Sequence, residues 1–414
     1  MSSGLPESKD DVARRLSQHA YSTSLRSIGI KRADGAQLHS NSPCEDHFNC
    51  AQPFTPWQGG TWAAVTVFDG HNGPQTAEFL QKELLAWVQT RLSKLEPESR
   101  TDKGICRAIE TCFTDLDEAI IGPYVGNMRN NDVTLVEKIR AMQLAMSGSC
   151  ALLVLFNPDA RTLYTACTGD SRAVLGRQTS DGTWRPEALS QDQNGSNESE
   201  MARIRDEHPN EEAATRDGKV LGLAVTRAFG DVPWKASHDV LAELSQRCFT
   251  HYPMAKEKAP TPPYLTAKPV ITVTKLQDGA PAILTLASDG LWDMCEDWEV
   301  VDLAVRWLEA QPKSALEEMD VKIKMAPETV WWKRRTRQEA KPDPGFDFLA
   351  RWDGFDVRFT EKKTTVEDLD NVAVHLLRNA CGGNHQELLT AKLAFEPPYS
   401  RNVRDDMTVQ VLFF

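Results

Sequence analysis

Single aspartates stand at the ends of short apolar runs in this sequence, and their carboxylates are the first candidates for chemistry. Asp69, Asp170 and Asp289 each follow such a run, and Asp293 comes four residues after Asp289. Asp405, by contrast, precedes an apolar run. If the runs are antiparallel strands, the beginning of one strand lies beside the ends of its neighbours. We therefore expect these carboxylates to gather at one edge of a sheet.

Glu45 and Asp46 precede a further expected strand, residues 48–51, and could join the same cluster. Carboxylates a few ångströms apart raise one another's pKa, so such a cluster needs cations to offset its charge. Mg²⁺ and Mn²⁺ prefer carboxylate, carbonyl and water oxygens, and a pair of these ions roughly 4 Å apart can activate water and clamp a phosphoryl group. Gly70 would let the backbone approach a metal closely, and His71 could protonate a leaving group.

Each of these features also has a simpler interpretation. Asp-Gly is a common turn dipeptide after a strand, so the pairs that begin at Asp69 and Asp289 are each explained by a turn. A lone histidine such as His71 is ordinarily a packed or surface residue. A turn explains the whole set less well than each member, because it does not account for several acids at strand ends together.

The elements that must position these acids follow from the spacing of apolar residues. Strands are predicted by seven short runs rich in β-branched residues, namely 62–68, 151–156, 162–167, 172–175, 270–273, 283–287 and 408–414. Amphipathic spacing predicts helices over 76–95, 103–121 and 298–308. A fourth helix is predicted to open at Thr365, since Asp368 follows three residues later as in a capping box.

The order of these elements predicts the fold class. Asn157, Pro158 and Asp159 join two consecutive predicted strands, which implies a hairpin and antiparallel pairing. Helices before and after a series of consecutive strands indicate an α+β fold with helices packed on antiparallel sheets, not an alternating parallel one. No Gly-rich phosphate loop of the dinucleotide or P-loop type is present in the sequence.

Composition excludes several classes of function. The 414 residues include 47 Lys and Arg against 59 Asp and Glu, a net charge of -12 that argues against a nucleic-acid partner. No apolar run reaches the roughly 18 residues of a membrane span. The nine cysteines are odd in number and form no C-x-x-C pair, which favours a reducing compartment over a disulfide framework.

Domain organisation is predicted as a flexible tail over residues 1–24 and a single catalytic domain over 25–414. Two arginines and several serines in the tail suggest a mitochondrial presequence, but three nearby acids argue against one and favour the cytoplasm. Residues 190–219 are polar and expected to be irregular. Residues 312–364 form an expected insertion whose tryptophans and basic residues are a docking site for a partner, a nuclear-targeting patch or a solvated face.

Six motifs in this order resemble those of the metal-dependent protein phosphatases (protein phosphatase 2C): Asp69-Gly-His-Asn-Gly, Ser147-Gly-Ser-Cys-Ala, Gly169-Asp-Ser-Arg-Ala-Val, Leu223-Ala-Val-Thr-Arg-Ala-Phe-Gly-Asp231, Ala287-Ser-Asp-Gly-Leu-Trp-Asp293 and Asp405-Asp-Met-Thr408. The resemblance runs from about residue 40 to the C-terminus. It implies a β-sandwich of two antiparallel sheets flanked by pairs of antiparallel helices. It also implies hydrolysis of phosphoserine and phosphothreonine in phosphoprotein substrates.

The resemblance assigns roles to the acids. It implies two Mn²⁺ or Mg²⁺ ions bridged by Asp69 and a third, weaker ion. The remaining implied metal-site residues are Gly70 through its carbonyl, Asp289 and Asp405 as direct ligands, Glu45 and Asp46 through water, and Asp170 and Asp293 at the third ion. A metal-bridging hydroxide would attack phosphorus in line, and His71 would protonate the leaving oxygen.

Four segments further resemble the pyruvate dehydrogenase phosphatase branch, a mitochondrial one: Leu38-His-Ser-Asn-Ser-Pro-Cys-Glu-Asp, Arg227-Ala-Phe-Gly-Asp, Thr261-Pro-Pro-Tyr-Leu-Thr-Ala-Lys-Pro and Arg404-Asp-Asp-Met-Thr. The compartment therefore stays open between mitochondrion and cytoplasm. Residues 232–267 fall where the family carries a variable flap, which either selects substrates or is merely structural.

The chain departs from the family at the substrate phosphate. Many members place an arginine four residues before the Glu of the Glu-Asp pair, whereas this chain has Asn41, leaving phosphate to metal-bound waters or to a cation such as Lys31 or Arg32. Arg172 and Arg227 are expected to order acids, such as Asp170 and Asp231, instead of binding phosphate.

A second departure is at Asp406, which stands where many members have Asn and would add charge near the metals. Two alternatives to an active protein phosphatase stay open. One is an inactive or weak family member used as a binding module, and the other is a small-molecule phosphomonoesterase.

Overall fold

The computed structural model describes residues 8–247, 260–319 and 364–414. Its contacts divide the chain into two compact units, a first of residues 1–44, 173–188 and 276–414 and a second of residues 45–172 and 189–275. Each unit has its own antiparallel sheet and its own helices. A single catalytic domain over 25–414 stays a prediction.

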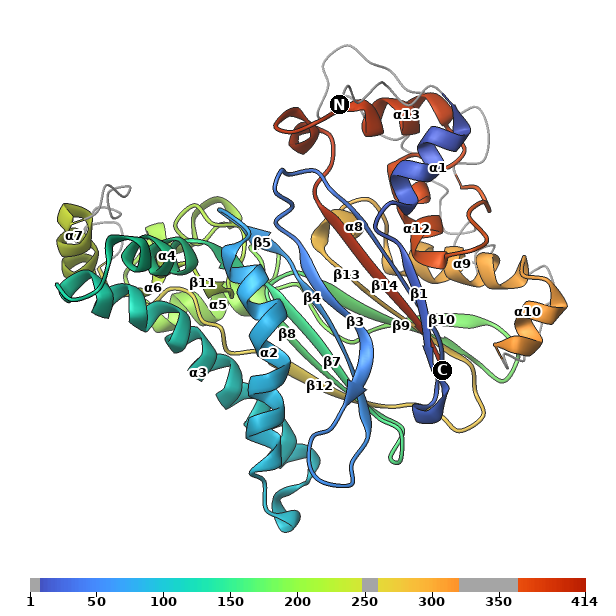
Figure 1. Ribbon diagram of the computed structural model, residues 1–414, viewed down its shortest axis with the longest axis horizontal. Helices are drawn as coiled ribbons and strands as arrows, with labels where there is room; N and C mark the ends of the chain where they lie inside the picture. The colour runs from blue at the N-terminus through green and yellow to red at the C-terminus, as the bar shows by residue number, and fades with distance from the viewer. Residues whose placement is uncertain (1–7, 248–259, 320–363) are drawn as a thin grey trace. The chain divides into compact units, whose positions relative to one another are not determined.

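The first unit is built on a six-stranded sheet (Figure 1). Its strands are, in spatial order, β1 (Tyr21–Leu25), β2 (Ile30–Leu38), β14 (Met407–Phe413), β13 (Ala282–Ala287), β9 (Arg172–Gln178) and β10 (Trp184–Ala188). The central pair, β13 and β14, is antiparallel, and every residue of both strands is buried. These two strands consist mostly of apolar residues because both of their faces are covered.

Helices cover this sheet and close a core around it. They are α1 (Lys9–Ser17), α8 (Asp289–Trp292), α9 (Asp297–Glu309), α10 (Lys313–Glu318), α12 (Val372–Cys381) and α13 (Gln386–Ala394). One apolar cluster joins side chains of α1, α9 and α12 to side chains of β2, β13 and β14.

The prediction of a flexible tail over residues 1–24 is wrong for the part that the structure describes. Residues 9–17 form α1, whose first turn is capped by the side chain of Ser8, and β1 follows it. Val12 and Leu16, four residues apart on one helix face, are both 0% exposed and belong to the core of the first unit. Burial of this apolar face outweighs the polar composition of the segment.

The predicted helix start at Thr365 is also wrong. The helix α12 begins at Val372, and its N-cap is Asn371, whose side chain accepts a hydrogen bond from the amide of Val374. Asp368 has a left-handed backbone (φ 56°) and pairs with Arg378 instead of closing a capping box. The helix is therefore capped by Asn371, which directly precedes its apolar residues, and not by the predicted capping box of Thr365 and Asp368.

The second unit contains a five-stranded sheet and a three-stranded one. The first has the order β12 (Val270–Lys275), β8 (Thr162–Thr168), β7 (Ala151–Asn157), β4 (Trp62–Phe68) and β3 (His47–Phe54). The smaller sheet has the order β11 (Phe229–Gly230), β6 (Gly148–Ser149) and β5 (Gly70–His71). Every pairing in both sheets is antiparallel, including the predicted β7–β8 hairpin.

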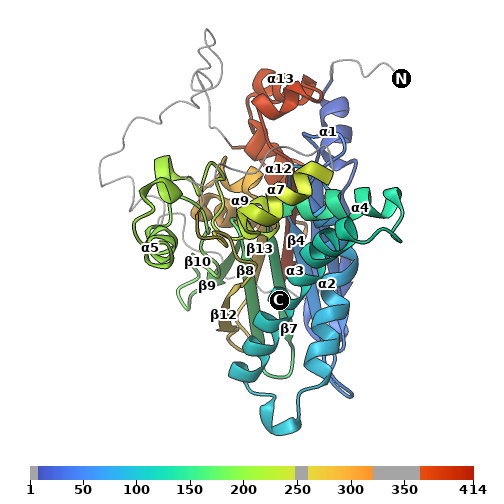
Figure 2. The ribbon, with the colours of Figure 1, turned by 90° about the vertical axis from the view of Figure 1, so that its left-hand side faces the viewer.

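The helices of the second unit are α2 (Gln75–Ser93), α3 (Asp102–Arg129), α4 (Leu135–Met146), α5 (Glu198–Glu207), α6 (Val232–Lys235) and α7 (His238–Arg247). The long helices α2 and α3 lie side by side and share an apolar cluster with β4, β7 and β8 (Figure 2). The segment 190–219, expected to be irregular, contains α5. Of the 312–364 insertion, residues 320–363 lie outside the described residues.

The α+β class with helices on antiparallel sheets is confirmed. Eight cysteines are described, and none of the eight forms a disulfide bond with another. Among the helices that the structure describes, none has both the length and the apolar character to cross a bilayer.

Leu16→Ala should destabilise the protein by about 2–5 kcal/mol, because it removes a fully buried side chain and leaves a cavity in the first unit. The matched control is Arg14→Ala on the same helix, where the side chain is 76% exposed and the effect should stay within about 0.5 kcal/mol. Urea unfolding followed by circular dichroism measures both. Equal stability of Leu16→Ala and the wild type would contradict the placement of α1.

Candidate functional site

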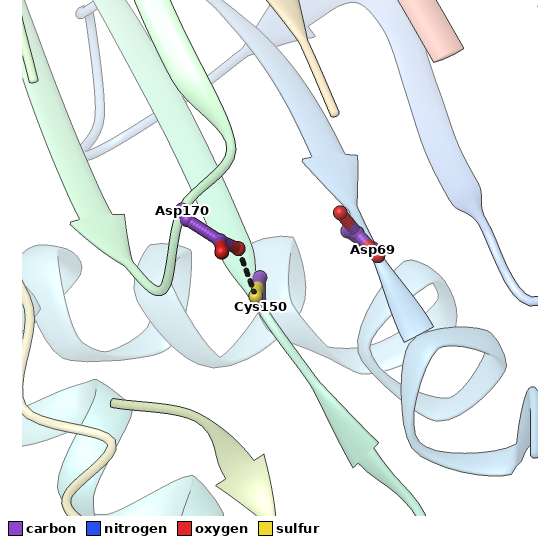
Figure 3. Close-up of side chains that lie close together, drawn as sticks. All are labelled: Asp69, Cys150 and Asp170. Carbon is purple, nitrogen blue, oxygen red and sulfur yellow. Dashed lines mark hydrogen bonds between the residues drawn. The ribbon is translucent and has the colours of Figure 1, made fainter. Parts of the chain in front are cut away.

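The second unit brings acids from two strands to one sheet edge. Because β4 and β8 both pair antiparallel with β7, they run in the same direction and end at the edge where β7 begins. Asp69 follows β4, Asp170 lies two residues beyond β8, and Cys150 directly precedes β7. One ligand atom from each of the three side chains lies within 4.8 Å of the other two (Figure 3). The prediction that these two aspartates converge is met.

The Glu45-Asp46 pair reaches the same edge through the register of β3. His47 pairs with Phe68, so Asp46 lies opposite Asp69 and Glu45 opposite Gly70. A side chain at Gly70 would collide with the carbonyl oxygen of Glu45, so glycine is required for this close approach. The carboxylate of Glu45 accepts a hydrogen bond of 2.6 Å from the amide of Gly73.

Burial makes this carboxylate cluster electrostatically costly. It raises the pKa of Asp170, even though the thiol of Cys150 donates a hydrogen bond of 3.3 Å to that carboxylate. Burial, and then the neighbouring Asp170 and Asp69, raise the pKa of the Cys150 thiol well above its ordinary value. A bound cation would relieve both shifts, and carboxylate oxygens at this spacing suit a hard divalent ion. The donor set therefore fits Mg²⁺ or Mn²⁺.

His71 is held by Asp231 through the smaller sheet. In this sheet Gly148 of β6 pairs with His71 of β5 on one side and with Gly230 of β11 on the other. The imidazole Nε2 of His71 and Oδ2 of Asp231 meet at 2.7 Å across Gly148. A side chain at Gly148 would occupy the space between them, at 2.6 Å from Cγ of Asp231 and closer still to Nε2 of His71.

The electrostatic surroundings of His71 favour its protonated form. Burial alone would lower the pKa of His71, but Asp231, with smaller contributions from Asp170 and Glu45, outweighs burial and raises it. Asp231 is itself fully buried, and its second oxygen Oδ1 has no hydrogen-bond partner among the described residues. The contact between the buried carboxylate of Asp231 and the imidazole therefore favours a charged His71.

A buried ion pair fixes the backbone that carries Asp231. Asp231 has a left-handed conformation (φ 51°), and its amide donates to the carbonyl of Ser147. The carboxylate of Asp117 on α3 accepts from the amide of Gly230 at 2.8 Å and from Nζ of Lys235 at 2.6 Å. Gly230 before Asp231 and Lys235 after it are thus both tied to α3, which fixes where the carboxylate of Asp231 points.

In the first unit, acids follow the end of β13 and precede the start of β14. These strands are antiparallel, with Ala287 opposite Val409, so Asp289 lies beside the residues that precede β14. A side chain at Gly290 would meet the carbonyl oxygen of Asp406, which shows how closely the two segments approach. Asp293 lies one helical turn beyond Asp289, and its amide donates to the carbonyl of Asp289 at 2.8 Å.

Asn41 does not point freely toward a ligand. Its amide nitrogen and its side-chain Nδ2 donate to the two carboxylate oxygens of Asp406, each at 2.9 Å. Asp405, the residue before Asp406, forms an ion pair with Arg401. Asn41 and Asp406 therefore form a structural contact beside the predicted metal ligand Asp405.

Each of three arginines with an expected role pairs with a carboxylate. Arg32, a candidate for binding phosphate, is engaged by the carboxylate of Asp34 at 2.8 Å and lies 5.1 Å from the ring centre of Trp307. Arg172 and Arg227 do pair with acids, but the expected partners Asp170 and Asp231 are wrong. Their partners, brought close by the chain after β10, are respectively Asp192 and Glu200.

Burial alone would raise the pKa of Glu200, but hydrogen bonds from Arg227 and Arg203 lower it to about 2. Glu200 is therefore the charged partner of a structural ion pair at neutral pH. This pairing removes Arg227 from the set of residues available to a substrate.

Sequence reasoning missed the parts played by Cys150 and Asp231. Cys150 lies in one of the recognised motifs, but the motif does not show that its thiol donates a hydrogen bond to Asp170. Asp231 stood in a recognised motif, but nothing in the spacing linked it to His71, 160 residues earlier.

Known proteins resemble this chain in sequence. Residues 35–328 match the family model of protein phosphatase 2C. A protein phosphatase 2C homolog of Schizosaccharomyces pombe is 33% identical over 99% of this chain and 86% of its own length. The mitochondrial [pyruvate dehydrogenase [acetyl-transferring]]-phosphatase 1 of Saccharomyces cerevisiae is 32% identical over 94% of this chain and 69% of its own length.

Among solved structures, the serine-threonine phosphatase 2C of Toxoplasma gondii has a similar fold. Its TM-score is 0.51 at 16% identity, and the match covers 95% of this chain and 99% of the other. The expected fold is thereby confirmed.

Gly148→Ala should separate His71 from Asp231 and destabilise the smaller sheet, because the added methyl group has no room between them. The control is Gly126→Ala on α3, which meets nothing within 4 Å and should stabilise by about 0.5–1 kcal/mol. Thermal unfolding and the imidazole ¹⁵N chemical shifts of His71 measure the two effects. Unchanged imidazole shifts in Gly148→Ala would contradict the described contact.

Proposed function

The chain belongs to the protein phosphatase 2C family and is a metal-dependent serine/threonine phosphatase, and we propose that its acids bind a binuclear Mn²⁺ or Mg²⁺ centre at which phosphoserine and phosphothreonine are hydrolysed directly. The observation that carries this proposal is the convergence of Asp69 and Asp170, with Glu45 and Gly70 beside them, at one sheet edge.

In this proposal Asp69, the carbonyl of Gly70, Glu45 and Asp46 serve the two ions from the second unit. Asp289 and Asp405 are proposed as further ligands on their sequence motifs, and Asp170 and Asp293 as ligands of a third, weaker ion. Bound divalent cations supply the Lewis acidity that activates water and offset the charge of the phosphoryl group. The carboxylates keep these cations in place, and burial makes an uncompensated charge there unfavourable.

We propose His71 as the general acid. Its contact with Asp231 favours the protonated imidazole, which can donate a proton to the leaving oxygen of serine or threonine. Alkoxide leaving groups are strong bases, so this proton matters most for phosphoproteins. Asp231 fixes the imidazole orientation through Nε2, so the proton available to a substrate is the one at Nδ1.

Of two competing functions, one is disfavoured by particular residues and the other stays open. A binding module without catalysis would have no need to retain Asp69, Asp289 and Asp405, and all three are present. A small-molecule phosphomonoesterase is the alternative that Asn41 leaves open, since phosphate is not held by an arginine there.

The relatives suggest a substrate and a compartment to test. One relative is named a mitochondrial phosphatase of pyruvate dehydrogenase, and we propose phosphorylated pyruvate dehydrogenase as a candidate substrate and the mitochondrion as the corresponding compartment. The flap over residues 232–267 as a substrate selector, and a docking partner at 312–364, stay predictions.

Release of phosphate from a phosphothreonine peptide should require Mn²⁺ or Mg²⁺ and stop on addition of EDTA. Asp69→Ala should lower kcat at least about 10³-fold, because it removes a ligand of both proposed ions, while circular dichroism shows an unchanged fold. Glu187→Ala, which removes an exposed carboxylate, is the control. Metal-independent turnover, or full activity of Asp69→Ala, would refute the proposed centre.

His71→Ala should slow hydrolysis of the phosphopeptide about 10²–10⁴-fold and that of p-nitrophenyl phosphate far less, because nitrophenolate leaves without a proton. Asp231→Asn should shift the same ratio in the same direction by a smaller factor. Equal losses on both substrates would remove His71 from the role of general acid and leave it a structural residue.

A further inference from the structure

Arg401 is a surface arginine attached to the carboxylate of a proposed metal ligand. It lies in the short 3₁₀ helix Tyr399–Asn402 and pairs with Oδ2 of Asp405, four residues later. The two side chains are 45% and 24% exposed, whereas those of the structural pair Arg378–Asp368 in the same unit are 3% and 11% exposed. The guanidinium of Arg401 is thus open to solvent and can reach a ligand.

The backbone around Arg401 is anchored next to Asn41. The hydroxyl of Ser400 donates to the carbonyl of Ser40, and the hydroxyl of Ser40 donates to the carbonyl of Arg404 at 2.7 Å. Both serines are fully buried. Ser400, which precedes Arg401, is thus hydrogen-bonded to Ser40, which precedes Asn41. The backbone of Arg401 is therefore held close to residue 41.

Position 41 itself cannot supply the cation that a phosphate group needs. Asn41 carries no charge, and its Nδ2 is already bonded to Asp406. A phosphate dianion is recognised best by the planar, bidentate guanidinium group. Arg32, Arg172 and Arg227 are each engaged by a carboxylate that is no proposed metal ligand.

We propose that Arg401 binds the phosphate group of the substrate and so replaces the arginine that is missing at position 41. The proposal rests on Asp405 being a metal ligand, as the proposed function has it. Oδ1 of Asp405 accepts from the amide of Asp406 at 2.7 Å, so Oδ2, the oxygen that Arg401 contacts, is the one that a cation would take. A cation at Oδ2 of Asp405 would weaken the attraction that holds Arg401 and leave its guanidinium donors available to the phosphate.

This arrangement predicts opposite effects of Arg401→Gln on two affinities. Without the competing guanidinium, Mg²⁺ should bind with equal or up to about 10-fold higher affinity. Inorganic phosphate should bind the Mg²⁺-loaded protein about 10-fold or more weakly, the size of losing a charge-assisted hydrogen bond. The phosphate affinity of Arg401→Lys should lie between those of the wild type and Arg401→Gln, since lysine keeps the charge but loses the bidentate geometry. Calorimetric titration measures both affinities without requiring turnover.

Controls separate a phosphate contact from a structural one. Arg306 pairs with Asp302, four residues away, in the same unit. Arg306→Gln removes this ion pair and should change neither affinity. Asn41→Arg added to Arg401→Gln should restore phosphate affinity to within about threefold of the wild type. Thermal unfolding confirms that each variant is folded.

Two outcomes would overturn the proposal: phosphate affinity unchanged in Arg401→Gln, or Mg²⁺ and phosphate affinities falling together as for a damaged loop. A wild-type protein that shows no metal-dependent turnover but binds Mg²⁺ and then phosphate through Arg401 would refute the proposed activity alone. A Mg²⁺-loaded wild type that binds no phosphate would refute the role of Arg401.

Discussion

Repulsion between carboxylates at strand ends is the constraint on which the candidate site depends. Asp69 and Asp170 meet because β4 and β8 flank one antiparallel strand and end at the same edge. Hydrophobic burial of these strands fixes their register, and the register leaves no freedom to move the acids apart. The folding energy of the second unit thus holds charges together that would separate in an unfolded chain. A divalent cation resolves this conflict and would bind more tightly because the ligands are already in place.

Small residues at three positions let the backbone segments approach closely enough for this chemistry. Gly70 faces the carbonyl of Glu45, Gly148 lies under the contact between His71 and Asp231, and Gly290 faces the carbonyl of Asp406. At each position a methyl group would collide with a partner that bears on the site. The Asp-Gly pairs are therefore more than turns: at Gly70 and Gly290 the glycine is needed for close approach to another strand's end.

Local patterns predicted the strands well and the polar partners poorly. The run 62–68 coincides with β4, and 151–156 and 162–167 fall within β7 and β8, because continuous burial of these strands is visible as unbroken apolar sequence. The convergence of Asp69 with Asp170 followed from antiparallel pairing alone. The partners of Arg172 and Arg227 could not be predicted, since they depend on how the loop after β10 folds back. The contact of Asp231 with His71 and the position of Arg401 near residue 41 also join distant parts of the chain, so the spacing of residues could not predict them.

The acids near the proposed centre differ in how far hydrogen bonds and ion pairs within the protein offset their charge. This difference separates structural acids from metal ligands. Asp406 accepts hydrogen bonds from the amides of Ser40 and Asn41 and from the Asn41 side chain, so both of its oxygens are used and it serves as a structural acid. It therefore adds less to the field at a metal than its charge suggests. Asp170 receives a bond from a thiol, a weak donor, and burial raises its pKa. Within each unit, an acid whose partners are weak or displaceable gains most from a cation, and by this criterion Asp170 and Asp405 are better metal ligands than Asp406.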